Sequence, residues 1–170
     1  MKRSGKNKSV ASELHEAYLN IGSNIEPEHH LQEAIRSLRE YGQVNSISNA
    51  WQSHAFGSDG PDFLNACVLF LTPLKAHQLK EQVIRPIERK LGRIRSTDKY
   101  APRTIDIDVI LFDDEPFGGE FWSNAFVVVP LADLLPDFRH PLNYERLAQV
   151  AEHMRRQTWI EARPEVLGAN

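Results

Sequence analysis

The segment from Phe63 to Leu71 constrains the fold of this chain more than any other part of the sequence. Every position in it except Asn65 is apolar, and Pro61 and Pro73 flank it. A short, nearly continuous apolar run between turn residues is typical of a strand in the interior of a sheet. We therefore expect this segment to form a central strand.

The remaining elements follow in a recognisable order. We expect a first helix that Ser23 or Asn24 caps, and a second helix that Pro86 kinks or splits. The order β-α-β-β-α-β predicts an α+β fold, a ferredoxin-like antiparallel sheet with helices on one face, followed by a C-terminal helical extension. The expected strands are 16–21, 44–51, 63–71 and 104–112, the helices are 26–40, 76–91 and 144–156, and 126–135 is a short apolar element broken by two prolines.

Length and charge exclude several classes of protein. The 170 residues fit one domain, residues 15–170, after a basic tail, residues 1–14, that we expect to be disordered. The net charge of −3 argues against a general nucleic-acid coat, and no stretch approaches the roughly 20 apolar residues that span a membrane. Cys67 is the one cysteine, which fits a reducing, cytoplasmic location. We expect its side chain to be packed in the interior.

Thr104 to Phe112 carries the clearest chemical signal. Strand alternation places Asp106 and Asp108 on one face and Ile105 and Ile107 on the other. Two such carboxylates lie roughly 6–7 Å apart at the backbone, so they can converge on one Mg²⁺ or bridge two. The alternative is an amphipathic strand with a solvated acidic face.

A cluster of basic residues precedes the two aspartates. A triphosphate with bound Mg²⁺ needs carboxylates for the metal and cations for the remaining oxygens, and this stretch supplies both. Without the aspartates, these basic residues would fit equally well a solvent-exposed helix end and loop, which is the alternative interpretation. No G-x-x-x-x-G-K-[ST] sequence is present, so any nucleotide site is not a P-loop. The basic residues are Arg85, Arg89, Lys90, Arg93, Arg95, Lys99 and Arg103.

Aromatic residues around the loop 55–61 indicate a site for a flat ring. Phe56 and Phe63 flank the loop, and Asn65 lies on the same strand face as Phe63. Stacking on a phenylalanine and hydrogen bonding to an amide suit a heteroaromatic ligand. Core packing of the two phenylalanines is the alternative.

Five segments in this order resemble the 6-hydroxymethyl-7,8-dihydropterin pyrophosphokinase family of folate synthesis. The run Pro-Arg-Thr-Ile-Asp-Ile-Asp is highly specific to that family, and Pro-Asp-Phe-Leu-Asn-Ala is nearly so. The resemblance covers roughly residues 16 to 150. The matching segments are 21–24, 61–66, 87–95, 102–108 and 126–131.

The resemblance implies that the chain transfers a diphosphate from MgATP to the hydroxymethyl group of the dihydropterin and releases AMP. It implies two Mg²⁺ ions on Asp106 and Asp108, small-molecule partners only, and a monomer or weak homodimer. Arg93 and Arg103 complete the implied catalytic set. The implied nucleotide-binding residues are Glu88, Arg93, Arg95, Arg103 and Thr104, and the implied pterin-binding residues are Ser53, Phe56, Phe63, Asn65, Tyr100 and Phe126.

The loop that follows the two aspartates departs from the family. The resemblance implies a longer loop with a histidine and arginines, whereas residues 113–125 contain no His, Arg or Lys and four acidic residues. Asn124 stands at an expected arginine position, and His140 reads as structural. A non-catalytic or altered-acceptor relative therefore remains an alternative. An RNA-binding module is disfavoured by the net charge and the apolar strand.

Overall fold

The computed structural model describes residues 13–168. The expected basic tail, residues 1–14, lies outside the described residues except for Glu13 and Leu14. Among the helices of the described part, none is both long and apolar enough to cross a bilayer.

The strands form one antiparallel sheet in the order β6-β5-β1-β4-β3-β7, with β2 also paired to β4. The predicted central strand is confirmed, because β4 lies between β1 on one side and β2 and β3 on the other. The bounds are β1 His15–Ser23, β2 Gln43–Ile47, β3 Ala50–Ser53, β4 Phe63–Thr72, β5 Asp106–Phe112, β6 Glu115–Pro116 and β7 Ile160–Arg163.

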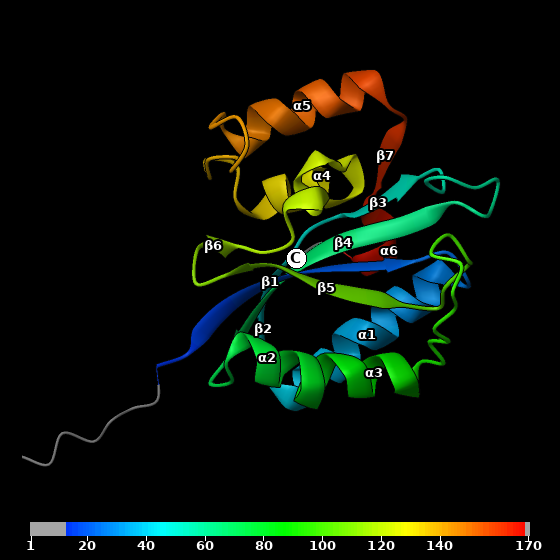
Figure 1. Ribbon diagram of the computed structural model, residues 1–170, viewed down its shortest axis with the longest axis vertical. Helices are drawn as coiled ribbons and strands as arrows, with labels where there is room; N and C mark the ends of the chain where they lie inside the picture. The colour runs from blue at the N-terminus through cyan, green and yellow to red at the C-terminus, as the bar shows by residue number, and fades with distance from the viewer. Residues whose placement is uncertain (1–12, 169–170) are drawn as a thin grey trace, which may run out of the picture.

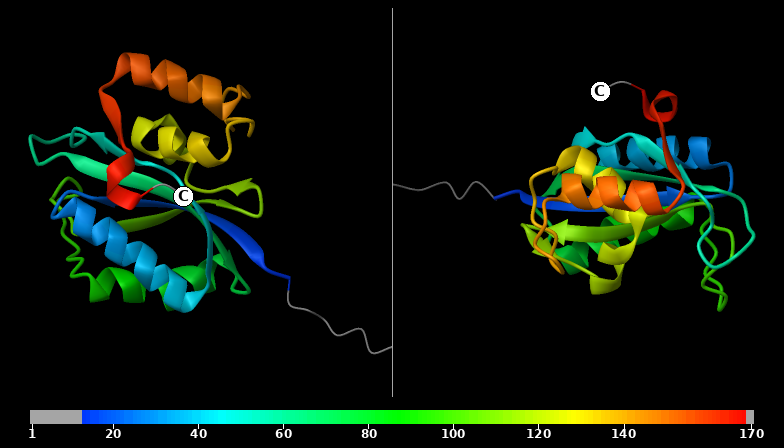
Figure 2. Two further views of the ribbon diagram at one scale, coloured as in Figure 1. Left: turned by 180° about the vertical axis from the view of Figure 1, so that it is seen from behind. Right: turned by 90° about the horizontal axis from the view of Figure 1, so that it is seen from above.

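Helices cover both faces of the sheet (Figure 1). The two helices expected on one face, 26–40 and 76–91, do share a face, and the second face is covered by the segment 125–134 and by the C-terminal helical extension. The first face carries α1 and the segment from α2 to α3, and the second face carries α4 with α5 above it. Seen from behind, α6 lies beside α1 (Figure 2), where the Gln32 amide donates to the Val166 carbonyl at 2.8 Å. The bounds are α1 Pro27–Tyr41, α2 Ala76–Leu79, α3 Arg85–Lys90, α4 Ala125–Leu134, α5 Leu147–Gln157 and α6 Pro164–Leu167.

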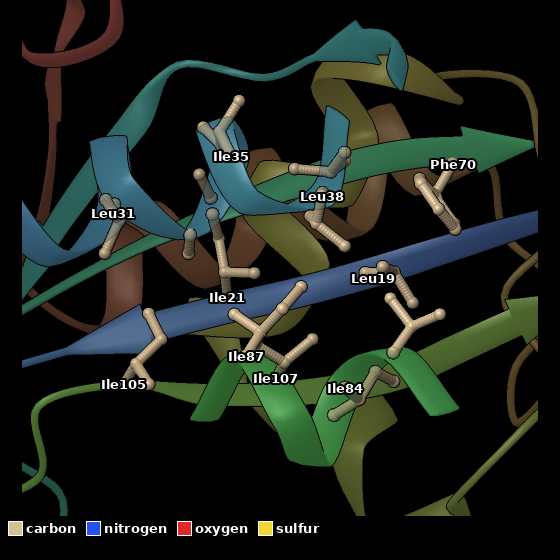
Figure 3. Packing of buried hydrophobic residues seen from close by; sticks show 14 of the residues in the cluster. Leu19, Ile21, Leu31, Ile35, Leu38, Phe70, Ile84, Ile87, Ile105 and Ile107 are labelled. Atoms are coloured by element: carbon tan, nitrogen blue, oxygen red, sulfur yellow. The ribbon is translucent and has the colours of Figure 1, made fainter. Parts of the chain in front are cut away.

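Aliphatic side chains fill the space between the first sheet face and its helices (Figure 3). Leu19 and Ile21 point from β1 toward Leu38 of α1 and Ile87 of α3, and all four are fully buried. Apolar burial of this kind is the main favourable term in folding, and here it fixes β1 against two helices. Alternate residues of β1 face this core, which leaves the intervening residues for the second face.

The second core explains why α4 was not predicted as a helix. Val127, Val128 and Leu131 are buried between the sheet and α5, so the segment is apolar all round and shows no helical stripe. Pro130 lies inside α4, although the sequence suggested that it would break the element. Burial of apolar surface on both sides outweighs the hydrogen bond that this proline cannot make.

Pro86 alters the helix without ending it. The helical path runs on from α2 through a π-helical segment, Lys80–Ile84, into α3. The Arg85 N–H donates to the Lys80 carbonyl, five residues back, which is π-helical pairing. The wider turn lies directly before the proline, whose ring would otherwise meet the preceding turn. The expected helix 76–91 is thus confirmed as a continuous helical segment, but its middle part is π-helical and not α-helical.

We predict that Trp122→Ala lowers the free energy of unfolding by about 3–5 kcal/mol, because this side chain is fully buried in the second core. Trp159→Ala is the matched control, since Trp159 is 41% exposed and should cost about 1 kcal/mol or less. Urea unfolding curves measure both values. Equal losses for the two variants would contradict the packing described for the second face.

Candidate active site

A cavity of about 160 Å³ opens on the second face of the sheet, next to the loops that join β3 to β4 and α3 to β5 (right side of Figure 1). All six residues predicted to bind the pterin line it, together with Arg103 and both aspartates. The structure thus brings residues from five separate segments into one cavity. The lining residues are Asn20, Gly22, Ser53, His54, Phe56, Phe63, Asn65, Lys99, Tyr100, Arg103, Asp106, Asp108 and Phe126.

The register of β1 positions the polar floor of this ring cavity. Gly22 pairs with Asn65 of β4 on one side and with Asp106 of β5 on the other. Two residues earlier, Asn20 pairs with Asp108. A Cβ added at Gly22 would lie 2.4 Å from the Asn65 side-chain oxygen, so glycine is required for the amide to lie across β1. The Asn20 amide donates to that oxygen at 3.3 Å.

Aromatic side chains form the walls of the cavity. Phe63 comes from the start of β4 and Phe126 from the first turn of α4. Phe56 is 69% exposed, and its ring centre lies 6.4 Å from that of Tyr100. Gly57 has a φ of 73°, and a Cβ there would lie 2.5 Å from the Tyr100 ring. The cavity is comparable with the roughly 150 Å³ that holds one benzene molecule, so its enclosed part suits a flat ring.

The two aspartates lie at one side of the cavity in different charge environments. Arg103 donates to Asp106 at 2.6 Å, and Arg93 lies 3.9 Å from the other oxygen of the same carboxylate. Burial raises the pKa of Asp108 to about 7, and the neighbouring charges of Asp106 and Glu88 add to this effect. The alternation predicted for this strand is confirmed, since Ile105 and Ile107 belong to the first core.

Glu88 links Arg95 to β5. Its carboxylate accepts the Ile107 N–H at 3.1 Å and pairs with Arg95 at 3.2 Å. Burial raises the pKa of Glu88, and the hydrogen bond from Ile107 opposes that rise. Glu88, Arg93 and Arg95 line a separate basic hollow together with Glu81, Arg85 and Arg89. These three predicted nucleotide residues therefore lie beside the ring cavity and not in it.

Thr104 does not line either hollow and precedes the first residue of β5. Its hydroxyl oxygen is nonetheless buried without a hydrogen-bond partner. Within residues 13–168, the other buried side-chain atoms without a partner are Asn20 Oδ1, Ser53 Oγ, Arg93 Nε and Arg103 Nε. Buried polar groups are nearly always paired, so a cluster of unpaired ones around a cavity indicates atoms that a ligand satisfies.

Several site residues were not singled out from the sequence. Asn20 and Gly22 carried a signal, because they interrupt an otherwise apolar strand. Lys99 was part of the basic cluster read from the sequence but was not assigned to the cavity, and His54 was given no role. Asn24 does not cap α1 as expected: its side chain accepts the Arg103 N–H at 2.8 Å and donates to the Pro61 carbonyl at 3.3 Å. It thereby ties the two loops that bound the cavity to the end of β1.

The acidic loop 113–125 directs its charges away from the cavity. Asp113 pairs with His15 at 2.5 Å and accepts the Glu16 N–H at 2.9 Å, at the far end of β1. None of the loop's four acidic residues lines the ring cavity. His140 is buried, and its ring lies 2.7 Å from the Trp122 carbonyl, which it anchors. The loop therefore adds no negative charge to the cavity lining.

Residues 18–136 match the family model described as 7,8-dihydro-6-hydroxymethylpterin-pyrophosphokinase (HPPK). This range covers more than half of the chain and contains every residue of the ring cavity.

The chain belongs to the HPPK family.

Similar proteins agree with this assignment. The 2-amino-4-hydroxy-6-hydroxymethyldihydropteridine pyrophosphokinase of Synechocystis is 33% identical over 153 residues, 84% of this chain and 77% of the relative. The protein of the same name from Aquifex aeolicus is 30% identical over 74% of this chain and 83% of its own length. A folate synthesis bifunctional protein of Arabidopsis thaliana is 30% identical over 71% of this chain, which spans 27% of that larger protein.

Family membership identifies the chain as a pyrophosphokinase of folate biosynthesis, a transferase that uses ATP as co-substrate. The expected α+β fold with an antiparallel sheet is confirmed by the structure. The alternative of a non-catalytic or altered-acceptor relative is not favoured by these comparisons.

We predict that Gly22→Ala weakens pterin binding about tenfold or more, because the added methyl group must displace the Asn65 amide. Nucleotide affinity should stay within about twofold, since the atoms nearest to the added Cβ all belong to Asn65. Gly119→Ala is the control, because a Cβ there meets nothing within 4 Å. Calorimetric titration with each ligand measures the effect. Unchanged pterin affinity in Gly22→Ala would contradict the position given to Asn65.

Proposed function

We propose that this HPPK-family chain binds 6-hydroxymethyl-7,8-dihydropterin in the ring cavity and transfers the terminal diphosphate of MgATP to its hydroxymethyl oxygen. The observation that carries the proposal is the position of Asp106 and Asp108 in the lining of the same cavity as Phe63, Asn65 and Phe126. A ring held there lies beside the carboxylates that would hold metal-bound phosphates. This proximity supplies a large part of the catalysis in phosphoryl transfer.

The carboxylates fit Mg²⁺ as ligands shared with a substrate. Within the described residues, no group of three or more His, Cys, Asp or Glu side chains is arranged to hold a metal ion alone. Mg²⁺ accepts one or two carboxylates together with water and substrate phosphates, so Asp106 and Asp108 are a suitable pair. When bound, the two ions of the proposal would offset the charge of the phosphate oxygens.

Asp106 is paired with arginines before any phosphate arrives. Arg103 and Arg93 neutralise its carboxylate, and each has a buried Nε atom without a partner. In the proposal, each arginine keeps some of its N–H donors on Asp106 and uses the others to bind the triphosphate. A guanidinium presents several donors in a fixed plane, which suits this shared role.

The polar edge of the cavity would orient the ring. Asn65 and Asn20 present amide groups, and the Ser53 hydroxyl is buried without a partner. The ring edge of a pterin carries donors and acceptors that such groups can satisfy. The hydroxymethyl oxygen then attacks the β-phosphorus, the bond to the bridging oxygen of the α-phosphate breaks, the hydroxyl proton is released, and AMP leaves.

The proposal places the enzyme in the cytoplasm, as a monomer or weak homodimer that acts on small molecules. The buried free thiol of Cys67 supports a reducing compartment. The net charge of −3 supports a protein that does not coat nucleic acid.

We predict that Asp106→Asn lowers Mg²⁺-dependent formation of AMP by about 10²–10³-fold, because the substitution removes the charge that the metal and arginines share. The matched control is Asp114→Asn, an exposed aspartate of the acidic loop with a φ of 66°, which asparagine tolerates. Steady-state kinetics with saturating pterin measures both. Comparable turnover in Asp106→Asn and the control would contradict the proposed metal site.

We predict that Asp108→Asn raises the melting temperature of the metal-free protein by a few degrees at about pH 8 and by much less at about pH 4. The pKa of Asp108 is raised from 3.8 to about 7 in the folded chain. Between these values the folded state holds a proton that the unfolded state has released, so stability from this group falls as pH rises. An equal gain at both pH values would contradict the charge assigned to Asp108.

A further inference from the structure

A second hollow lies on the other side of Asp108 from the ring cavity. It has a volume of about 420 Å³ and is bounded by the helical path before Pro86, by β5 and by the loop 113–125. Asp108 is the one residue that lines both hollows. The lining is otherwise mostly apolar and comprises Ala76, His77, Lys80, Ile84, Ile107, Asp108, Val109, Phe117, Gly118 and Phe121.

Lys80 brings a positive charge into this second hollow, which we call the donor hollow. Its side chain makes no hydrogen bond or ion pair with the described part of the chain, and after Arg103 it is the second positive charge that lowers the pKa of Asp108. Ala76, Lys80 and Ile84 are spaced by four residues, which keeps them on one face of the helical path toward β5. Lys80 opens the π-helical segment, a feature that is frequent at functional sites.

Two arginines of the basic hollow are held in ion pairs with glutamates. Arg85 pairs with Glu81 at 2.6 Å, and Arg95 pairs with Glu88 at 3.2 Å. The basic hollow shares no lining residue with the ring cavity. Residues 113–125 contain no His, Arg or Lys, so this loop supplies no cation to the ring cavity or to the donor hollow. Arg103 lines the ring cavity and not the hollow on the other side of Asp108, so there Lys80 on the helical path is placed to supply a cation.

The direction of transfer assigns a role to this lysine. The attacking and leaving oxygens lie roughly in line through the transferred phosphorus. With the acceptor in the ring cavity, the leaving nucleoside monophosphate lies on the opposite side of the carboxylates, which is the donor hollow. We propose that Lys80 binds the α-phosphate of the nucleotide there and neutralises the charge left on its oxygen when the bond to the β-phosphorus breaks. This inference rests on the proposed diphosphate transfer.

AMP and adenosine are the probes that isolate this contact, because they differ by the α-phosphate alone. We predict that Lys80→Met weakens AMP binding about 10- to 100-fold, the loss expected for a charged hydrogen bond, and leaves adenosine binding within about twofold. Lys80→Arg keeps the charge and should retain AMP affinity within about fivefold. Isothermal titration of the full chain measures all of these values.

Lys90→Met is the matched control. It removes the same charge from α3, where Lys90 bonds to Ser37 at 3.2 Å and lies 3.7 Å from Glu40, toward α1 and away from both hollows. Its AMP affinity should equal that of the unmodified chain. In turnover, Lys80→Met should lower kcat/KM for ATP and leave KM for the pterin unchanged.

Three outcomes would overturn the inference. The first is full AMP affinity in Lys80→Met, and the second is an equal loss of AMP and adenosine binding in that variant. The third is a loss of AMP binding in Arg89→Met where Lys80→Met keeps it. The last result would place the nucleotide in the basic hollow. An unmodified chain that binds AMP through Lys80 but forms none from MgATP and pterin would contradict the proposed function and leave the Lys80 contact standing.

Discussion

The pairing of β1 between β4 and β5 is the constraint on which the site depends. It sets Asn65, Gly22 and Asp106 in one row across three strands and places Asn20 beside Asp108. A slip of β1 by one residue would turn Asn20 toward the first core and move Gly22 out of the row with Asn65 and Asp106. The burial of Leu19 and Ile21 against the helices of that core holds the register, so packing on one face of the sheet positions chemistry on the other.

The site also concentrates groups that oppose the stability of the fold. Burial raises the pKa values of Asp108 and Glu88, and unpaired polar atoms of Asn20, Ser53 and Arg103 lie nearby. Such groups are costly in an empty protein and become useful when a charged, hydrogen-bonding ligand satisfies them. Bonds from Asn24 to the two bounding loops keep these groups in place.

Much of this could be predicted from the sequence, because the decisive patterns are local. The apolar run of β4 and the alternation of β5 each follow from residues close together in the chain. The second helical layer could not be predicted, since α4 is apolar on all sides and its partner surface comes from distant segments. The loop 113–125 looked electrostatically unfavourable in sequence, yet Asp113 pairs with His15, a contact between residues 98 positions apart. Where the site residues sit could be inferred in part, and their roles remain predictions.

The absence of basic residues from that loop makes turnover the central question. We propose that the phosphates are neutralised by Arg93, Arg103 and Lys80, all of which lie outside the loop. The most direct test is AMP formation from MgATP by the purified chain, with and without 6-hydroxymethyl-7,8-dihydropterin. We expect AMP formation that requires both Mg²⁺ and the pterin, in an amount equal to the pterin diphosphate formed. Absence of AMP, or formation of ADP in its place, would contradict it.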